Sequence, residues 1–452
     1  MMNDKNDLTT GSVGKTVILF ALPYLLSCFM QTFYGMVDLF VVGIYNGSET
    51  TTAVSIGSQV THMLTVIIVG LAMGATVKIG QSVGAKDEQT AKKAIGTTVV
   101  FFVFFALAIT VILTLLTRPI DGVMMTPNEA FEETASYLLI CFAGIPFIVA
   151  YNVISSIFRG MGDSKRPMYF VAVACVTNIV LDFLFIGAFR LGAAGAALGT
   201  VCGQAVSVFV ALFVMTKKGF GLSITKNDFR IHKNILSDIV KVGVPIALQD
   251  GLIQVAFIVI TVIANSRGLI MATSVGIVEK LIVFMFLVPS AFLSAISAIT
   301  AQNLGAGKTK RAKQALRYGL FITISWGIIC VIYNQFLPQT LVGLFTKDSA
   351  VAAAGCDYLR AYVFDCLFAA VHFCFSGYFC GSGRSGISFL HNIISIIVVR
   401  IPVAYFASVW FPDSLYPMGA AAPLGSVLSA LICIGFYAYY NYKDNKALKP
   451  SL

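Results

Sequence analysis

Apolar runs long enough to cross a lipid bilayer recur along the whole chain of 452 residues. A membrane-spanning helix needs about 20 largely apolar residues. Only 12% of the residues are charged, whereas a typical soluble protein has about 25%. The runs predict an all-α polytopic membrane protein, because a helix satisfies its backbone polar groups internally when it crosses lipid. The twelve expected helices cover residues 16–44, 52–77, 94–117, 135–158, 167–189, 193–216, 236–264, 270–300, 315–337, 351–379, 386–411 and 418–442.

The lysines and arginines between these runs are distributed unevenly. Twenty-four of them fall in the two termini and in every second loop, among them Arg159, whereas five fall in the other loops. Cytoplasmic loops of membrane proteins carry an excess of basic residues. The count predicts a multi-pass protein of the plasma membrane with both termini cytoplasmic. The basic residues of these cytoplasmic loops also account for the net charge of +10. Because the charge is explained in this way, we expect no nucleic-acid partner.

Ten cysteines lie almost entirely within the apolar runs, at spacings that resemble no zinc site. We expect them to be reduced and to act as small packing residues. The sequence contains no visible nucleophile–base pair, metal cluster or phosphate-binding loop. We therefore expect neither enzymatic activity nor a cofactor.

The two halves of the chain repeat one another. Residues 81–94 are QSVGAKDEQTAKKA, and residues 302–315, 221 positions later, are QNLGAGKTKRAKQA. Each half has six expected helices, so both halves insert with the same orientation, as in transporters built from parallel repeats. Two pseudo-symmetric bundles favour alternating access. We expect an amino-terminal lobe at 1–216 (helices 1–6), a cytoplasmic linker at 217–241 and a carboxy-terminal lobe at 242–452 (helices 7–12).

Polar side chains form stripes on three helices of the first half. Residues four apart share one face of a helix, and a carboxylate in the middle of a span costs roughly 2.5–3.5 kcal/mol on insertion scales. The second half has no equivalent acids, and Val403 lies 221 residues beyond Asp182. The stripes are Gln31, Tyr34 and Asp38 on helix 1, Asn178 and Asp182 on helix 5, and Thr200 and Gln204 on helix 6.

We expect these stripes to form one cation site. Two carboxylates close together at low dielectric resist simultaneous ionisation, so one of them can take up and release a proton. The same oxygens, with an amide carbonyl and a hydroxyl, also suit sodium, and the expected ligands are then Asp38, Asn178, Asp182 and Thr200. The alternative is a purely structural set of interhelical hydrogen bonds, although two buried acids are a costly way to hold helices together.

Three more carboxylates and one arginine fall inside the expected spans. We expect Arg400 to form a structural charge pair with Asp365 or Glu279. We expect Asp250 to lie near the start of helix 7, within reach of cytoplasmic water. Pro23 in helix 1 removes a backbone hydrogen bond and permits a bend. The bend could couple ion binding to helix movement, and a static kink is the alternative.

Several motifs resemble those of the multidrug and toxic compound extrusion (MATE) family. They are GQSVGAK at 80–86 with its echo AQNLGAGK at 301–308, FRGMGDS at 158–164 with its echo FCGSGRS at 379–385, and GAALGT at 195–200. The resemblance covers essentially the whole chain and is nearest to the DinF-like subgroup. It implies a V-shaped pair of six-helix bundles that exports amphipathic, often cationic, organic compounds in exchange for protons or sodium.

The resemblance also implies roles for individual residues. It implies that Gln31, Gln204 and Asp182 contact the exported compound. The residues that it implies for ion coupling are the ones that the helical spacing selects. They are Tyr34, Asp38, Asn178, Asp182 and Thr200.

Other classes of protein fit the sequence less well. The NorM-like subgroup carries a glutamate on helix 7, where this chain has Ile253, with Asp250 one turn earlier. A flippase for lipid-linked oligosaccharides is the alternative within the superfamily. It would need a basic central cavity, and only Lys280 and Arg400 offer cations at membrane depth. A membrane-embedded enzyme or a sensor would need a catalytic motif or a signalling domain. We expect a monomer whose partners are small organic molecules, the coupling ion and lipid.

Overall fold

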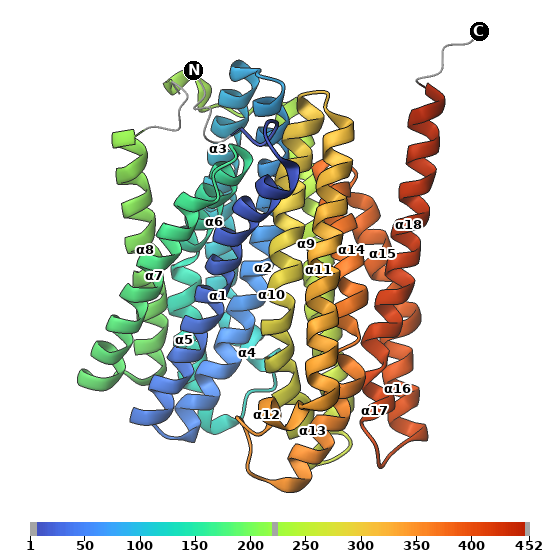
Figure 1. The fold of residues 1–452 in the computed structure, drawn as a ribbon. Helices are drawn as coiled ribbons and strands as arrows, with labels where there is room; N and C mark the ends of the chain where they lie inside the picture. The colour runs from blue at the N-terminus through green and yellow to red at the C-terminus, as the bar shows by residue number, and fades with distance from the viewer. Residues whose placement is uncertain (1–6, 219–224, 448–452) are drawn as a thin grey trace. The chain divides into compact units, whose positions relative to one another are not determined.

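The structure is a computed structural model that describes residues 7–218 and 225–447. These residues are almost entirely helical and include no strand (Figure 1). The chain forms two compact units. The first contains the described residues up to Thr10, together with Leu22–Ala247 and Ala301–Gly307. The second contains Gly11–Ala21, Leu248–Thr300 and the described residues from Lys308 onward.

Helices α1, α9 and α10 contribute residues to both units. The elements of the first half are α1 (Val13–Tyr45), α2 (Ser48–Gly84), α3 (Glu88–Leu115), α4 (Thr117–Val123), α5 (Asn128–Ala143), α6 (Ile145–Gly160), α7 (Lys165–Asp182), the π-helix η2 (Phe183–Ala188), α8 (Gly192–Lys218) and the 3-10 turn η3 (Lys226–Asp228). Those of the second half are α9 (Lys233–Asn265), α10 (Leu269–Gly305), α11 (Thr309–Phe336), α12 (Pro338–Val342), α13 (Ser349–Tyr362), α14 (Asp365–Gly381), α15 (Ser385–Ser395), the π-helix η4 (Ile396–Arg400), α16 (Ile401–Trp410), α17 (Tyr416–Gly419) and α18 (Ala421–Ala447).

Ten single helices of the described chain are long and apolar enough to cross a membrane. Two further spans are bent helix pairs, α5 with α6 at 48° and α13 with α14 at 42°, which makes up to twelve spans in the described residues. The expected spans at 135–158 and 351–379 are therefore each made of two helices joined at a bend. Pro146 explains the first bend, because it starts a new helix after Gly144 and cannot donate a backbone hydrogen bond. The second bend contains neither proline nor glycine, and it lies close to the position 221 residues after the first.

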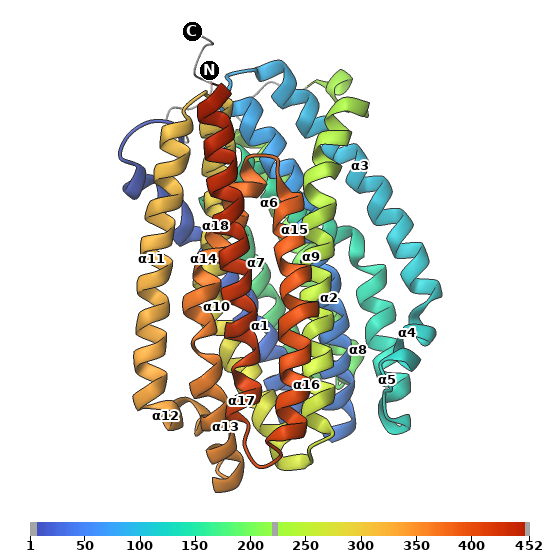
Figure 2. The ribbon, with the colours of Figure 1, turned by 90° about the vertical axis from the view of Figure 1, so that its right-hand side faces the viewer.

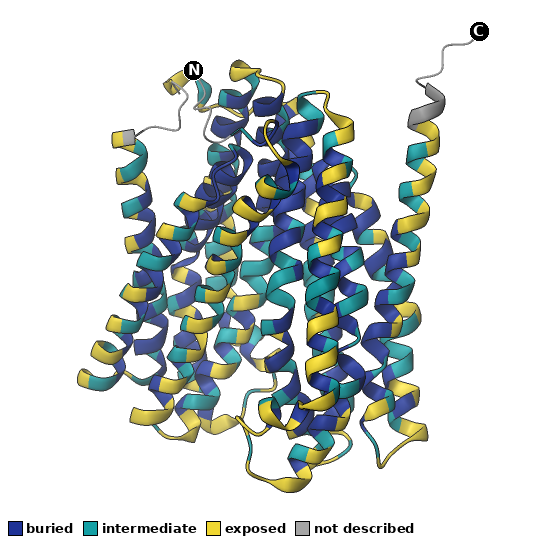
Figure 3. Ribbon diagram, in the orientation of Figure 1, coloured by how far each residue is buried: buried dark blue, intermediate teal, exposed yellow. Residues whose placement is uncertain are grey.

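Large apolar side chains cover the outer faces of the long helices. On α3, the side chains of Phe104, Leu107, Val111 and Leu115 are each more than half exposed, and their spacing forms one stripe. Soluble monomers rarely expose continuous apolar patches of this kind. Figure 3 shows exposed and buried residues alternating along the other long helices as well. The exposed stripes fit contact with lipid, and the opposite faces form the protein core.

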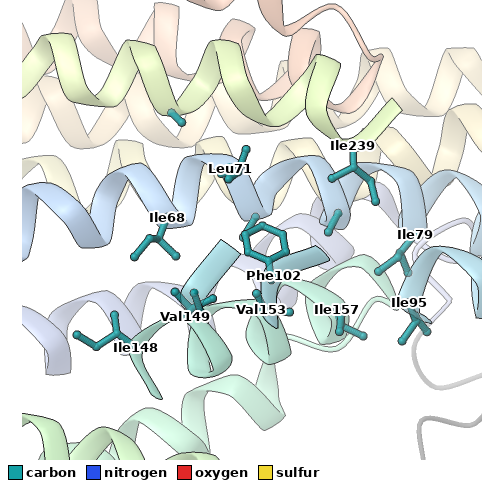
Figure 4. Close-up of a cluster of buried hydrophobic side chains, with 14 of the residues drawn as sticks. Ile68, Leu71, Ile79, Ile95, Phe102, Ile148, Val149, Val153, Ile157 and Ile239 are labelled. Atoms are coloured by element: carbon teal, nitrogen blue, oxygen red, sulfur yellow. The ribbon is translucent and has the colours of Figure 1, made fainter. Parts of the chain in front are cut away.

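A core of apolar side chains in the first unit joins five helices, α2, α3, α5, α6 and α9 (Figure 4). Leu71 of α2, Phe102 of α3, Val153 of α6 and Ile239 of α9 belong to this one cluster. The helices approach closely where a glycine allows it. A Cβ atom on Gly74 of α2 would lie 2.1 Å from the backbone oxygen of Ile239, so here α2 and α9 pack backbone against backbone.

The two copies of the repeated motif pack against each other within the first unit. A Cβ atom on Gly84 would lie 1.9 Å from the backbone oxygen of Gln302. A Cβ atom on Gly305 would lie 2.0 Å from the backbone oxygen of Gln81, at the pseudo-equivalent position. The side-chain amide of Gln302 also donates a hydrogen bond to the backbone oxygen of Gly160, at 2.9 Å. The repeated glycines and glutamines thus form one symmetric crossing of the ends of α2 and α10.

The two motifs also end their helices in the same way. Lys86 follows α2 with a φ of 57°, and Gly307 follows α10 with a φ of 71°. This left-handed conformation is common just after a helix, and glycine adopts it at the lowest cost. The backbone symmetry therefore extends to a position where the two residues differ.

The expected linker at 217–241 includes the ends of two helices. Helix α8 continues to Lys218, and α9 begins at Lys233, so residues 233–241 are helical. Residues 219–224 and the two ends of the chain, to which the expectation of cytoplasmic termini applies, lie outside the described residues.

Candidate functional site

Helices α1, α7 and α8 bring the three polar stripes together in the first unit. The hydroxyl of Thr200 donates a hydrogen bond to Oδ2 of Asp38, at 3.2 Å. The amide of Gln204 donates to the hydroxyl of Tyr34, at 3.3 Å. Both bonds connect α1 to α8, which packs beside α7 (Figure 1). The carboxyl group of Asp182 on α7 lies close enough to Asp38 for the two to interact directly.

Small residues at the start of α8 make this meeting of helices possible. A Cβ atom on Gly199 would lie 2.2 Å from Oδ1 of Asp182. A Cβ atom on Gly203 would lie 3.0 Å from the backbone oxygen of Ala174. Gly199 in the motif GAALGT therefore brings the backbone of α8 directly against the carboxylate of Asp182. One turn further on, Gly203 brings α8 against the backbone of α7.

The acid site lies at a change of helix type. Helix α7 ends at Asp182, and the chain continues as the π-helix η2. Short π-helical segments inside longer helices occur frequently at functional sites. The wider π-turn interrupts the regular spacing of α7 directly after the carboxylate.

The site is buried, and many of its polar atoms have no hydrogen-bond partner. Asp182 is 0% exposed, Asn178 is 2% exposed and Asp38 is 6% exposed. Apart from the close approach of Asp182 and Asn178 to Asp38, no hydrogen-bond partner is found among the described residues for Oδ1 of Asp38, for the polar atoms of the Asn178 amide, for the carboxylate oxygens of Asp182 or for Oε1 of Gln204. Buried polar groups in folded proteins are nearly always paired. This concentration of unpaired oxygens is chemically suited to a bound proton or cation.

The donor set fits a hard monovalent cation better than a transition metal. It offers carboxylate, amide and hydroxyl oxygens, which are the ligands that hard cations prefer. In the part of the chain that the structure describes, no group of three or more His, Cys, Asp or Glu residues could hold a metal ion. The residues present would therefore hold a proton or sodium through Asp38, Asp182, Asn178 and Thr200.

The two glutamines expected to contact the exported compound have different surroundings. Gln31 donates a hydrogen bond to the hydroxyl of Tyr151 on α6, at 3.4 Å, and lines a cavity of about 30 Å³. Gln204 is 8% exposed and does not line this cavity. A cavity of this size is far smaller than the roughly 300 Å³ or more of a drug-sized pocket.

The expected charge pair of Arg400 is wrong. No carboxylate oxygen in the described residues lies within 4.0 Å of its guanidinium group. Arg400 instead donates to the hydroxyl of Tyr362, at 2.7 Å, and lies over the ring of Phe257, at 4.8 Å. Asp365 and Glu279 are near enough only for longer-range attraction. The rotation of each helix about its axis decides such pairings, and sequence position alone does not give it.

The expected position of Asp250 is wrong as well. Helix α9 begins at Lys233, so Asp250 lies 17 residues inside it, about 25 Å from its start at 1.5 Å per residue. The polar interval before Lys241 looks like a loop in the sequence, but its last part is helical.

Two buried polar groups have surroundings that the sequence does not show, although His372 and His391 are expected in the core or along a cavity by default. In the second unit, the rings of His372 on α14 and His391 on α15 lie 5.4 Å apart. They are hydrogen-bonded to Ser426, at 3.3 Å, and to Ser376, at 2.8 Å. The helices α14, α15 and α18 that carry these residues lie side by side in both views (Figures 1 and 2). The other group is Arg159, which is 4% exposed although the basic-residue count places it with the loops.

The comparison with protein families decides what kind of chain this is. The family model described as MatE matches residues 23–184 and, a second time, residues 245–406. The chain belongs to the MatE family. The two matched segments have the same length and begin 222 residues apart, which confirms the internal repeat.

Curated relatives align over nearly the whole chain. The probable multidrug resistance protein YpnP of Bacillus subtilis (strain 168) is 29% identical over 444 residues, 98% of each chain. The probable multidrug resistance protein YoeA of the same organism is 26% identical over 435 residues, which is 95% of this chain and 94% of YoeA. The multidrug export protein MepA of Staphylococcus aureus (strain N315) is 24% identical over 403 residues, 88% of each chain. The chain is therefore a member of a family of multidrug transporters and not of a family of enzymes.

Solved structures confirm the fold. A MATE crystal structure in complex with MaL6 has a TM-score of 0.92 and 21% identity, and the match covers 98% of this chain and all of the other. The structure of a MOP superfamily transporter from Pyrococcus furiosus, described as having a binding pocket of reverse polarity, has a TM-score of 0.92 and 21% identity, with 97% and 98% of the two chains covered. At this identity the matches establish the architecture alone. The chain is a multi-pass helical membrane protein.

Proposed function

We propose that this protein is a cation-coupled antiporter that exports amphipathic organic compounds by alternating access. The observation that carries the proposal is the buried pair Asp38 and Asp182, which is surrounded by polar atoms without partners. A site of this kind gains most from binding a cation, because the ion neutralises one of the two carboxylate charges and provides a partner for the unpaired oxygens. The family relationship supports transport as the activity that such a site would drive.

Each residue of the site would have a distinct role. Asp38 and Asp182 would hold the driving proton or sodium, and Asn178 and Thr200 would complete its surroundings. Tyr34, held by Gln204, would fix the face of α1 that carries Asp38.

A ligand can move a conformational equilibrium only through a difference in affinity between the two states. Helix α1 can supply that difference, because it bonds to α8 at the site and contains Pro23 along its length.

Gln31, Gln204 and Asp182 would contact the exported compound. We further propose that the protein belongs to the DinF-like subgroup, that it lies in the plasma membrane with both termini in the cytoplasm, and that it works as a monomer. The oligosaccharide flippase is less favoured, since the relatives are multidrug transporters.

The test is efflux of a fluorescent organic cation from proteoliposomes that contain the purified full-length protein, with proton and sodium gradients imposed separately. We expect one of the two gradients to drive accumulation against the dye gradient. Dependence on protons alone would identify a protonated carboxylate pair as the coupling state. Dependence on sodium would identify the same residues as sodium ligands. Transport under neither gradient would contradict the proposal and favour the flippase.

Gly199→Ala should weaken coupling by filling the space beside Asp182. The added methyl group would lie 2.2 Å from the carboxylate oxygen, so the acid or α8 must move. Overpacking of this kind costs about 1–3 kcal/mol, and each 1.4 kcal/mol is about a tenfold change in affinity. We expect efflux at low driving-ion concentration to fall about tenfold or more. Gly43→Ala, with no atom within 4 Å of the added carbon, is the matched control and should transport normally.

A further inference from the structure

Arg159 is a buried cation that has no counter-charge among the residues that the structure describes. It lies in the last turn of α6 and is 4% exposed. Its Nε and Nη2 atoms are buried and have no hydrogen-bond partner. No carboxylate oxygen in the described chain lies within 4.0 Å of it. The nearby carboxylate of Asp163 is occupied, since it pairs with Arg166 at 3.2 Å and caps the start of α7.

The protein offers only weak compensation for this charge. The guanidinium carbon of Arg159 lies 5.1 Å from the centre of the Tyr24 ring. A cation–π contact of this kind contributes about 0.5–2 kcal/mol. An uncompensated buried charge costs several kcal/mol. Ser155, one turn earlier on α6, adds a buried hydroxyl that also lacks a partner. The balance therefore favours a bound counter-ion.

Arg159 lines the small cavity between α1 and α6 that also contains Gln31. The volume of about 30 Å³ is room for about two water molecules, since each needs about 10–15 Å³ by this measure. It can hold a halide ion or one carboxylate group, but not a drug-sized molecule.

The other polar groups around the cavity are neutral, and no acid lines it. The hydroxyl of Tyr151 accepts a hydrogen bond from Gln31, and like any phenol hydroxyl it can also donate one. The Nε and Nη2 atoms form one edge of the guanidinium group, and this edge binds carboxylates with two parallel hydrogen bonds. The cavity therefore combines a cation, hydroxyl donors and the absence of a competing acid.

We propose that Arg159 and this cavity form a binding site for one small monovalent anion, either chloride or the carboxylate group of a bound molecule. The site is separate from the acid site. Tyr24 lies 14 residues before Asp38 on α1, about 21 Å away along the helix. The pseudo-equivalent of Arg159 in the second half is Cys380, so the anion site belongs to the first half alone. It does not depend on which cation drives transport.

The test measures anion binding directly and does not require transport. The purified full-length protein is placed in isethionate buffer, whose anion is a bulkier sulfonate without a carboxylate group, and its unfolding temperature is followed as chloride or acetate replaces isethionate at constant ionic strength. We expect a saturable rise of a few degrees, because a ligand that binds only the folded state stabilises it. A response to chloride alone indicates an inorganic ion, and a response to acetate indicates a carboxylate. In crystals soaked with bromide, we expect an anomalous peak beside Nε and Nη2 of Arg159 if chloride is the ligand.

Variants separate this site from general salt effects. Arg159→Gln should abolish the saturable response, and Arg159→Lys should weaken the acetate response about tenfold or more, because lysine lacks the two-pronged edge. Arg118→Gln changes an exposed arginine that pairs with Glu132 and does not line the cavity, and it should leave the response unchanged. The proposal is overturned if the unaltered protein shows no saturable response to either anion. It is equally overturned if the response persists in Arg159→Gln. The unaltered protein decides the question even if that variant does not fold.

Discussion

Asp182→Asn is expected to abolish gradient-driven efflux and leave the protein folded. Asp182 is fully buried, and apart from the close approach of Asp38 neither of its carboxylate oxygens has a hydrogen-bond partner in the described chain. The amide has almost the same shape but cannot carry the charge that binds the driving ion. To move a two-state conformational equilibrium almost fully from one state to the other, a ligand must bind the favoured state about 10⁴-fold more tightly than the other state. We therefore expect the coupled efflux rate to fall by about 100-fold or more, to the level of liposomes without protein.

Folding distinguishes this loss from simple damage. An ionised carboxylate in a buried site is costly, so the neutral amide should leave the unfolding temperature unchanged or raise it. Asp38→Asn should behave in the same way, because the two acids act as one site. Asp357→Asn replaces an exposed acid of α13 and should leave efflux intact. Normal export against a gradient by Asp182→Asn would falsify the assignment of this residue.

The membrane architecture could be predicted because it depends on local properties of the sequence. An apolar run of sufficient length must be helical in lipid wherever it lies in the chain. The number of spans and their approximate positions follow from this rule. The bend at Gly144 could have been found from Pro146, but the second bend has no proline or glycine and carries no such signal.

The candidate site could be predicted in part. Helical spacing places Tyr34 and Asp38 on one face of α1, but it cannot say which face of which helix lies opposite. The structure adds that contact, with Thr200 bonded to Asp38 and the backbone at Gly199 lying against Asp182. The asymmetry between the halves was informative, because acids that serve only structure would have less reason to be confined to one half.

The errors share one physical cause. A span assigned from composition gives neither the rotation of the helix about its axis nor the direction of its long side chains. Arg400 therefore lies against Tyr362 rather than against an acid. Arg159 lies at the end of a span, where the basic-residue count places it with the loops, yet its side chain turns into the core.

The second large effect is expected from Gly84→Ala and from Gly305→Ala. Each added methyl group would lie within about 2 Å of a backbone oxygen, that of Gln302 or of Gln81. Those oxygens cannot easily move, because each also accepts a hydrogen bond from its own helix end, from the backbone N–H of Ala306 or Ala85. Overpacking a side chain costs about 1–3 kcal/mol, and more where the backbone must shift. We expect each variant to lower the free energy of unfolding by about 3 kcal/mol and the unfolding temperature by several degrees.

Gly276→Ala is the matched control for these variants. It lies within α10, and nothing is found within 4 Å of the added carbon. In an open helical position, alanine is more stable than glycine by roughly 0.5–1 kcal/mol, so this variant should unfold at the same or a higher temperature. If Gly84→Ala and Gly305→Ala unfold like this control, the close crossing of α2 and α10 is not present in the membrane protein.

The double variant shows whether the two glycines act at one contact. Both methyl groups push the same two helix ends apart, so the shift that relieves one clash also relieves much of the other. Mutations that share a contact are not additive, and their interaction energy is typically 0.5–3 kcal/mol. We therefore expect Gly84→Ala with Gly305→Ala to cost clearly less than the sum of the single variants. Full additivity would mean that the two copies of the motif pack independently, and the repeat would then need another physical explanation.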